Sequence, residues 1–352
     1  MREFLHVNDI GDLNVALKEA QEIKQDRYKF EHLGHHHTVL LIFFNNSLRT
    51  RLSTQKAARN LGLDVVVLDV NQGAWKLETE RGVIMDGDKS EHLLEAIPVM
   101  ASYCDLIGVR TFAGLSDREA DYTERILMQF MKYSNRPVFS MESATAHPLQ
   151  AFADLITIEE HKEKKRPKVV LTWAPHPRAL PQAVPNSFAE WMRAADVDFV
   201  VTHPKGYELD PLFIGDATVD YDQMHALENA DFVYAKNWSC PGVSNLADYG
   251  KILSKDMSWT IDEAHGRAKS ALLAGSVAKA LAATLFLSEI CRIVRVPQIN
   301  ACSVEAVTVA VSAMSRAYSS LPIFLLFFNW ITKSPLLAFP LTIVRVLPNM
   351  AL

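Results

Sequence analysis

The sequence has few of the residues that mark several common kinds of site. Its 352 residues include only four cysteines, and no two of them form a CxxC pair. Neither a zinc site nor a disulfide framework is therefore indicated. The opening stretch MREFLHVNDIGDLN lacks the apolar core of a signal peptide, so we expect a reducing, cytoplasmic location.

Other familiar patterns are also missing. No GxGxxG motif follows an expected strand and no Walker loop occurs, which argues against a dinucleotide site and a P-loop. The net charge is −5, so nothing favours non-specific binding of nucleic acid. Hydrophobic residues make up 49% of the chain, which suits a globular protein with sizeable cores and about two domains.

Apolar runs alternate with amphipathic segments in the first part of the chain. Residues 38–44, 63–70, 104–110 and 136–143 are expected strands, and residues 9–26, 47–61 and 90–103 are expected helices. This alternation predicts a doubly wound parallel sheet. The polar segment between residues 70 and 90 is expected to be a long functional loop.

The pattern restarts after the charged segment EEHKEKKRP. Expected strands lie at KVVLTW, VDFVVTHP and ADFVYAKNW, and the proline-rich loop APHPRALPQAVP leads into an expected helix over residues 186–195. We therefore expect an α/β fold with two doubly wound parallel-sheet domains. The expected divisions are residues 1–147, residues 148–259 and a divergent apolar tail over residues 260–352.

Charged side chains gather where the expected strands end. Ligands of such sheets bind beyond the carboxyl ends of the strands, and there the sequence places Arg110, Glu142, His147, His176 and Lys236. Each of them alone is more often structural than functional. Their convergence indicates an active site between the two domains.

The stretch FFNNSLRTRLS joins an expected strand to an expected helix. The free N–H groups of the first helical turn, beginning at Ser47, can bind an anion, and Arg49 and Thr50 add a charge and a hydroxyl. An ordinary capped helix with surface arginines is the alternative, and spacing alone leaves the two equal. Arg51 lies further on and is expected to support the turn or a neighbouring subunit.

Three motifs carry a family resemblance. SLRTR after a buried strand, VR ending in Arg110, and HPLQAFADLITI resemble the aspartate/ornithine carbamoyltransferases over roughly residues 1–259. SxRTR followed by HPxQxxxD is more specific than either motif alone. The GAWKLE loop, Glu142 and the proline-rich loop are similar to the branch that carbamoylates N-acylated ornithine.

The resemblance implies transfer of a carbamoyl group from carbamoyl phosphate to the side-chain amine of N-succinylornithine, in arginine biosynthesis. N-acetylornithine is the alternative acceptor. The first domain would bind carbamoyl phosphate and the second the acylated ornithine, with no metal and no organic cofactor. The resemblance further implies a knotted second domain and a homotrimer in which Trp75 reaches the neighbouring site.

The resemblance also implies roles for individual residues. The phosphate would be held by Ser47, Leu48, Arg49 and Thr50, and by Trp75 of a neighbour. The carbamoyl end would meet Arg110, His147 and Gln150, and the acylated ornithine would meet Glu142, His176 and Lys236. The expected catalytic residues, which would stabilise the developing oxyanion and the departing phosphate, are Arg49, Thr50, Arg110 and His147.

The resemblance stops after DMSWT. Residues 260–352 contain no HCLP motif, with which the family continues, and carry only four acidic and eight basic residues. The second domain is therefore expected to be incomplete. The alternatives are a non-catalytic relative that binds carbamoyl phosphate and, less favoured, a membrane-attached protein that uses the apolar end.

We hypothesise that this tail is a displaced reading frame or a fusion, because charge and motif content change abruptly at one point. Translation of the coding DNA past residue 259 in the other two frames tests the first version. We expect an HCLP-type segment in one of them, and its absence from both would contradict a frame displacement.

Overall fold

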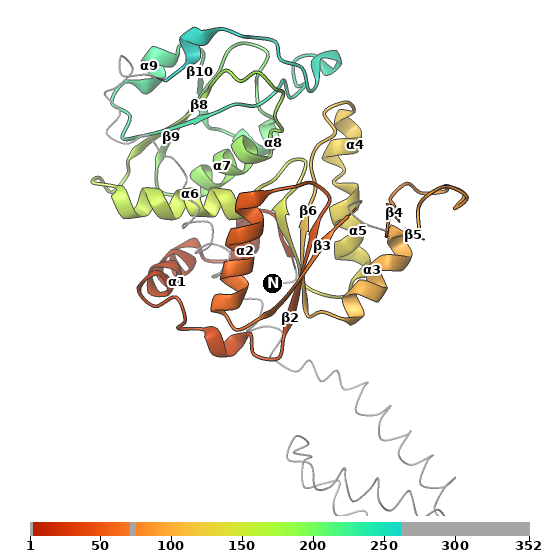
Figure 1. The fold of residues 1–352 in the computed structure, drawn as a ribbon. Helices are drawn as coiled ribbons and strands as arrows, with labels where there is room; N and C mark the ends of the chain where they lie inside the picture. Colours follow the sequence, from red (N-terminus) through yellow and green to blue (C-terminus); the bar gives the residue numbers. More distant parts are fainter. Residues whose placement is uncertain (1–2, 71–74, 262–352) are drawn as a thin grey trace, which may run out of the picture. The chain divides into compact units, whose positions relative to one another are not determined.

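The computed structural model describes residues 3–70 and 75–261 (Figure 1). The strands of the first sheet run parallel in the order β1-β7-β6-β2-β3, with bounds Glu3–Phe4, Val138–Glu142, Leu106–Arg110, Thr38–Phe43 and Asp64–Asp69. The second sheet is also parallel, in the order β10-β9-β8-β11, with bounds Thr218–Asp220, Asp198–Thr202, Lys168–Trp173 and Phe232–Lys236. The predicted α/β fold with parallel sheets is thus confirmed.

Helices connect the strands. Those in the first part of the chain are α1 to α5, with bounds Leu13–Gln25, Leu48–Asn60, Leu93–Ser102, Arg118–Tyr122 and Arg125–Tyr133. The remainder are α6 to α9, with bounds Pro148–His161, Ala183–Ala194, Pro211–Ile214 and Gln223–Leu227. Short 3-10 helices occur at Val7–Ile10, Glu31–Leu33, Leu246–Asp248 and Met257–Trp259.

Strand β2 shows why the first sheet is covered on both faces. Val39, Leu41 and Phe43 pack into one apolar cluster, while Leu40 and Ile42 pack into another. Successive side chains of a strand point to opposite faces, so an unbroken apolar run requires cover on both. The first cluster continues into α6, α7 and the second sheet, so both sheets share one core.

The predicted helix over residues 9–26 is wrong in one respect, because the structure divides it. A 3-10 turn ends at Ile10, Gly11 adopts a positive φ of 74°, and Asp12 begins α1. The Asp12 carboxylate accepts hydrogen bonds from the N–H groups of Asn14 and Val15, which makes it a strong N-cap. The helical periodicity continues across this break and so concealed it.

The predicted helix over residues 90–103 begins later than expected. His92 is its N-cap, because its Nδ1 accepts a hydrogen bond of 3.1 Å from the Leu94 N–H. The residues before it form a short parallel ladder, in which Glu91–His92 (β5) pairs with Leu77–Glu78 (β4). Part of the expected long loop is thereby ordered by backbone pairing.

Other differences concern short elements. Helix α7 begins at Ala183, three residues before the predicted start. Strands β1 and β10 and helices α4, α5, α8 and α9 were not predicted, and most have five residues or fewer. Within the described ranges no helix is long and apolar enough to span a membrane. The apolar tail, on which the membrane alternative rests, lies outside these ranges.

Candidate active site

The site begins at the N-terminus of α2, where the sequence predicted an anion site. Ser47 is the N-cap, and its Oγ accepts a hydrogen bond of 3.2 Å from the Thr50 N–H. Inside a helix the N–H groups of the first turn have no carbonyl partner, so those of Leu48 and Arg49 are open to a ligand. The Arg49 side chain is exposed and forms no ion pair with the other described residues.

The ends of β6 and β7 bring Arg110 against Glu142. The register between the two strands shifts after Val109, so that Arg110 pairs with Glu142 rather than with Met141. Such a bulge redirects a side chain. Arg110 Nη1 donates to Glu142 Oε2, and only 5% and 11% of the two side chains are exposed. An ion pair therefore joins the ends of the two strands. The sequence alone does not identify this partner for Arg110.

Arg110 also binds the first turn of α2. Its Nη1 lies 3.3 Å from Thr50 Oγ1 and 3.5 Å from the Met141 carbonyl oxygen, and Phe112 stacks on the guanidinium. Burial lowers the pKa of Arg110, while Glu142 acts in the opposite direction. The buried Nε finds no acceptor within the part of the chain that the structure describes. This donor is available to a ligand.

Helix α6 adds His147 and Gln150. Pro148 occupies the first helical position, which suits a residue without a backbone N–H, and His147 is the buried N-cap residue. Its Nε2 lies 3.5 Å from Glu142 Oε2, which joins it to the ion pair. Gln150 follows one turn later, and its Nε2 donates a 2.7 Å hydrogen bond to Asp154.

Asp154 was not singled out from the sequence, although its spacing from Gln150 puts both on one face of α6. It is fully buried, and with burial it raises the pKa of Tyr234. Asp154 thus links Gln150 of α6 to Tyr234 of β11.

Lys236 enters from the second sheet, at the end of β11. Burial lowers the pKa of Lys236, Glu142 opposes this effect, and Arg49 adds to it. The two cations are therefore close enough to repel each other. Lys236 forms no ion pair with the other described residues. Together with the helix end, this arrangement favours an anion carrying more than one negative charge.

Two predicted residues are not brought to this group within one chain. Trp75 is 62% exposed, and its Nε1 donates a 3.1 Å hydrogen bond to Glu91. His176 is exposed in the proline-rich loop, where its Nδ1 accepts a hydrogen bond of 3.1 Å from the Arg178 N–H. Arg51 forms an ion pair with Asp69 on the edge strand β3, a contact that differs from the support of the turn or of a neighbouring subunit expected from the sequence.

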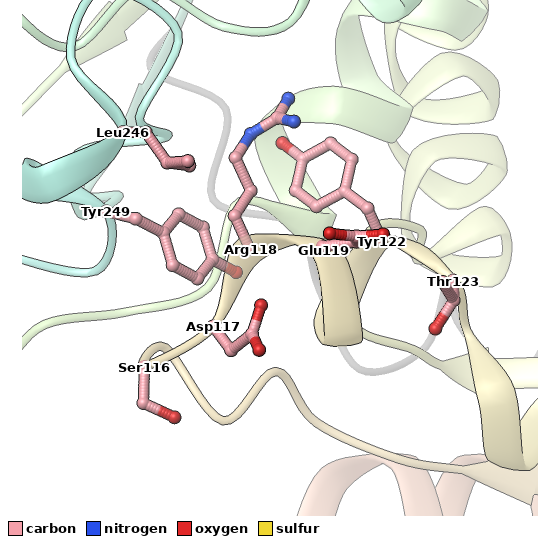
Figure 2. Close-up of a pocket in the computed structure, with 8 residues that line it drawn as sticks. All are labelled: Ser116, Asp117, Arg118, Glu119, Tyr122, Thr123, Leu246 and Tyr249. Atoms are coloured by element: carbon pink, nitrogen blue, oxygen red, sulfur yellow. The ribbon is translucent and has the colours of Figure 1, made fainter.

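A cavity of about 630 Å³ lies elsewhere, among residues that the sequence analysis did not choose (Figure 2). Leu246 and Tyr249 reach it from the segment after β11, and the other lining residues come from α4 and its flanks. Arg118 already binds Asp210 and the Pro241 carbonyl oxygen. The only cation among the described residues that line this cavity is therefore already paired, and the candidate site remains the group around Arg110. Within the described ranges no cluster of three or more His, Cys, Asp or Glu side chains could hold a metal ion.

Comparison with known proteins gives consistent results. Residues 2–160 match the family described as aspartate/ornithine carbamoyltransferase, carbamoyl-P binding domain. The chain is 69% identical over 263 residues to N-succinylornithine carbamoyltransferase of Bacteroides thetaiotaomicron, covering 75% of this chain and 82% of that relative. It is 34% identical over 281 residues to N-acetylornithine carbamoyltransferase of Xanthomonas axonopodis, covering 75% and 81%.

Solved structures show the same likeness. A variant of N-acetyl-L-ornithine transcarbamylase, complexed with carbamyl phosphate and N-succinyl-L-norvaline, matches with a TM-score of 0.71 at 30% identity. The match covers 84% of this chain and 99% of that one. Acetylornithine transcarbamylase complexed with acetylcitrulline gives a TM-score of 0.71 at 30% identity, with 84% and 98% covered.

The buried ion pair leads to a prediction about stability. Glu142→Gln keeps the side-chain volume but leaves Arg110 buried without its counter-charge, so we expect a loss of about 3–5 kcal/mol in the free energy of unfolding. The matched control is Glu80→Gln, which removes an Arg–Glu pair whose side chains are 40% and 58% exposed. That change is expected to cost less than about 1 kcal/mol. Urea unfolding measures both, and equal losses would contradict the prediction.

Proposed function

The chain belongs to the aspartate/ornithine carbamoyltransferase family, and we propose that it transfers the carbamoyl group of carbamoyl phosphate to the side-chain amine of N-succinylornithine. The products are N-succinylcitrulline and phosphate, in arginine biosynthesis. The 69% identity to N-succinylornithine carbamoyltransferase of Bacteroides thetaiotaomicron supports this acceptor. The observation that carries the proposal is the set of cations and donors around the N-terminus of α2, whose positive charge Glu142 balances only in part.

We assign the phosphate of carbamoyl phosphate to the first turn of α2. Ser47, Leu48, Arg49 and Thr50 provide N–H groups, a hydroxyl and a guanidinium at a helix N-terminus. Thr50 Oγ1 accepts from Arg110, so its own hydroxyl hydrogen is free to donate. A phosphate here would also relieve the repulsion between Arg49 and Lys236.

We assign the carbamoyl end to Arg110, His147 and Gln150. The free Nε of Arg110 is a buried donor beside the α2 turn, and His147 is joined to Arg110 through Glu142. The amine nitrogen attacks the carbamoyl carbon, a C–N bond forms and the C–O bond to phosphate breaks. Donors that meet the carbonyl oxygen stabilise the negative charge that develops on it, and Arg49 stabilises the departing phosphate. The amine loses one proton, which the departing phosphate is basic enough to accept.

The acylated ornithine is assigned to Glu142, His176 and Lys236. Lys236 is a partly buried cation without an ion-pair partner among the described residues, which suits a carboxylate of the acceptor. A succinyl group carries a distal carboxylate that an acetyl group lacks. N-acetylornithine is therefore the second candidate, supported by the 34% identity to the Xanthomonas axonopodis enzyme. The missing HCLP motif supports a further alternative, a relative that binds carbamoyl phosphate without turnover.

We further propose a cytoplasmic homotrimer in which Trp75 reaches the site of a neighbouring subunit. Its indole is exposed within one chain, and the same polar segment exposes Val83, Ile84 and Met85. Exposed apolar side chains grouped in this way are typical of surfaces that a partner covers. Helix α2 also exposes Leu48, beside the proposed phosphate site. Sedimentation of the purified chain measures the size of the assembly.

Product formation with three acceptors tests the proposed reaction. The full chain is mixed with carbamoyl phosphate and, in turn, with ornithine, N-acetylornithine or N-succinylornithine, and the carbamoylated product is measured. We expect the largest kcat/KM with N-succinylornithine. A larger value with N-acetylornithine would contradict the choice of acceptor. Carbamoyl phosphate binding without any product would favour the non-catalytic alternative.

Substitution of each arginine in the α2 turn tests the phosphate assignment. Arg49→Ala removes a charge-assisted contact, so we expect the Kd for carbamoyl phosphate to rise about 10- to 100-fold. Arg51→Ala is the matched control, because Arg51 binds Asp69 and stacks on Phe43 instead. It is expected to lower stability and leave the Kd unchanged. Calorimetric titration measures both, and an unchanged affinity in Arg49→Ala would remove the assignment.

A further inference from the structure

Glu124 is a buried carboxylate outside the residues assigned to the reaction, and its four side-chain hydrogen bonds all go to one turn. Its Oε1 accepts from Ser143 Oγ at 2.6 Å, from Thr145 Oγ1 at 2.6 Å and from the Thr145 N–H at 2.8 Å. Its Oε2 accepts from the Ala144 N–H at 3.2 Å. Within the described ranges Glu124 forms no ion pair. The hydrogen bonds that the buried carboxylate accepts therefore all come from this turn.

The turn connects two residues of the candidate site. Glu142 ends β7 immediately before it, and His147 begins α6 immediately after it. Every residue between them is buried. Because the turn is short, its conformation sets the position of the Glu142 carboxylate relative to the His147 ring. The two side chains lie 3.5 Å apart.

The remaining N–H groups of the turn are satisfied by other partners. The Ser143 N–H donates to the Ala146 carbonyl oxygen at 2.8 Å, and the Ala146 N–H donates to Ser143 Oγ at 3.1 Å. The His147 N–H donates to Ser187 Oγ on α7 at 2.8 Å. Loss of the Glu124 carboxylate would leave the two N–H groups that it binds buried without an acceptor, which a folded chain avoids by rearrangement.

The backbone of Glu124 also indicates that its side chain matters. Glu124 has φ 49° and ψ 34°, in the left-handed region that favours glycine and asparagine. A residue with a long side chain costs about 1–2 kcal/mol there. The position nevertheless carries a glutamate, whose carboxylate reaches a turn 19 to 21 residues further along the chain.

We propose that Glu124 is a positioning residue that sets the placement of His147 against Glu142 through the turn 143–146. This inference rests on the proposed function, because it concerns the same site. Glu124 touches neither substrate and acts through the turn. Since reaction rates fall steeply when reacting groups are displaced by about 1 Å, loss of the carboxylate should reduce turnover more than it reduces phosphate binding.

The test compares two substitutions at one position with a control. Glu124→Ala is expected to lower kcat about 10- to 100-fold, while the Kd for inorganic phosphate, which the α2 turn determines, stays the same. Glu124→Gln is expected to lose less, because an oxygen at the position of Oε1 keeps three of the four bonds. Unchanged kcat in Glu124→Ala would overturn the inference.

Asp105→Ala is the control, because this carboxylate also accepts a backbone N–H, that of Thr38 at 2.8 Å, but at the amino ends of the first sheet's strands. It is expected to lower the midpoint of unfolding and to leave kcat unchanged. An equal loss of kcat in Asp105→Ala would mean that turnover follows general stability, and this result would also overturn the inference.

Hydrogen exchange separates this inference from the proposed function. The amides of Ala144 and Thr145 are expected to exchange faster in Glu124→Ala than in the wild-type chain, and to keep wild-type rates in Asp105→Ala. This measurement needs no turnover. A wild-type chain inactive with all three acceptors would contradict the proposed reaction alone, whereas wild-type exchange rates in Glu124→Ala would overturn the role of Glu124.

Discussion

The ion pair between Arg110 and Glu142 is the contact on which the rest of the site depends. It joins the ends of β6 and β7, and its two members extend to different elements: Arg110 to Thr50 at the start of α2, and Glu142 to His147 at the start of α6. A lone arginine at this depth would be costly, since burial disfavours its charge. With Glu142 beside it, the charge is retained and one donor, Nε, is left for a ligand.

The negative charge of Glu142 also organises the cations around it. Burial lowers the pKa of Lys236, and Glu142 offsets part of this effect. Arg49 lowers the same pKa further. The positive charges of Arg49, Arg110 and Lys236 thus exceed the negative charge of Glu142. Because Arg110 is buried and Lys236 partly buried, this excess of positive charge is unfavourable until an anion binds. The free site is less well satisfied electrostatically than the occupied one, which is the property that a binding site for a charged substrate requires.

Much of this could be predicted from the sequence, because it depends on local patterns. Unbroken apolar runs identified the buried strands, and Ser47 identified the start of α2. What could not be predicted depends on register or on distance along the chain. The bulge after Val109 decides which residue faces Arg110, and no residue type signals it. Glu124 binds a turn some twenty residues away, so its role becomes visible only in the folded chain.

The apolar cluster shared by the two sheets has a consequence for how the chain loses its structure. Side chains from β2, α6, α7 and β8 belong to one continuous core, and α6 packs on both β7 and α7. Neither sheet can be exposed without uncovering part of the surface of the other. The division expected at residue 147 therefore does not mark two independently melting bodies, and heat should disrupt both sheets in one cooperative transition.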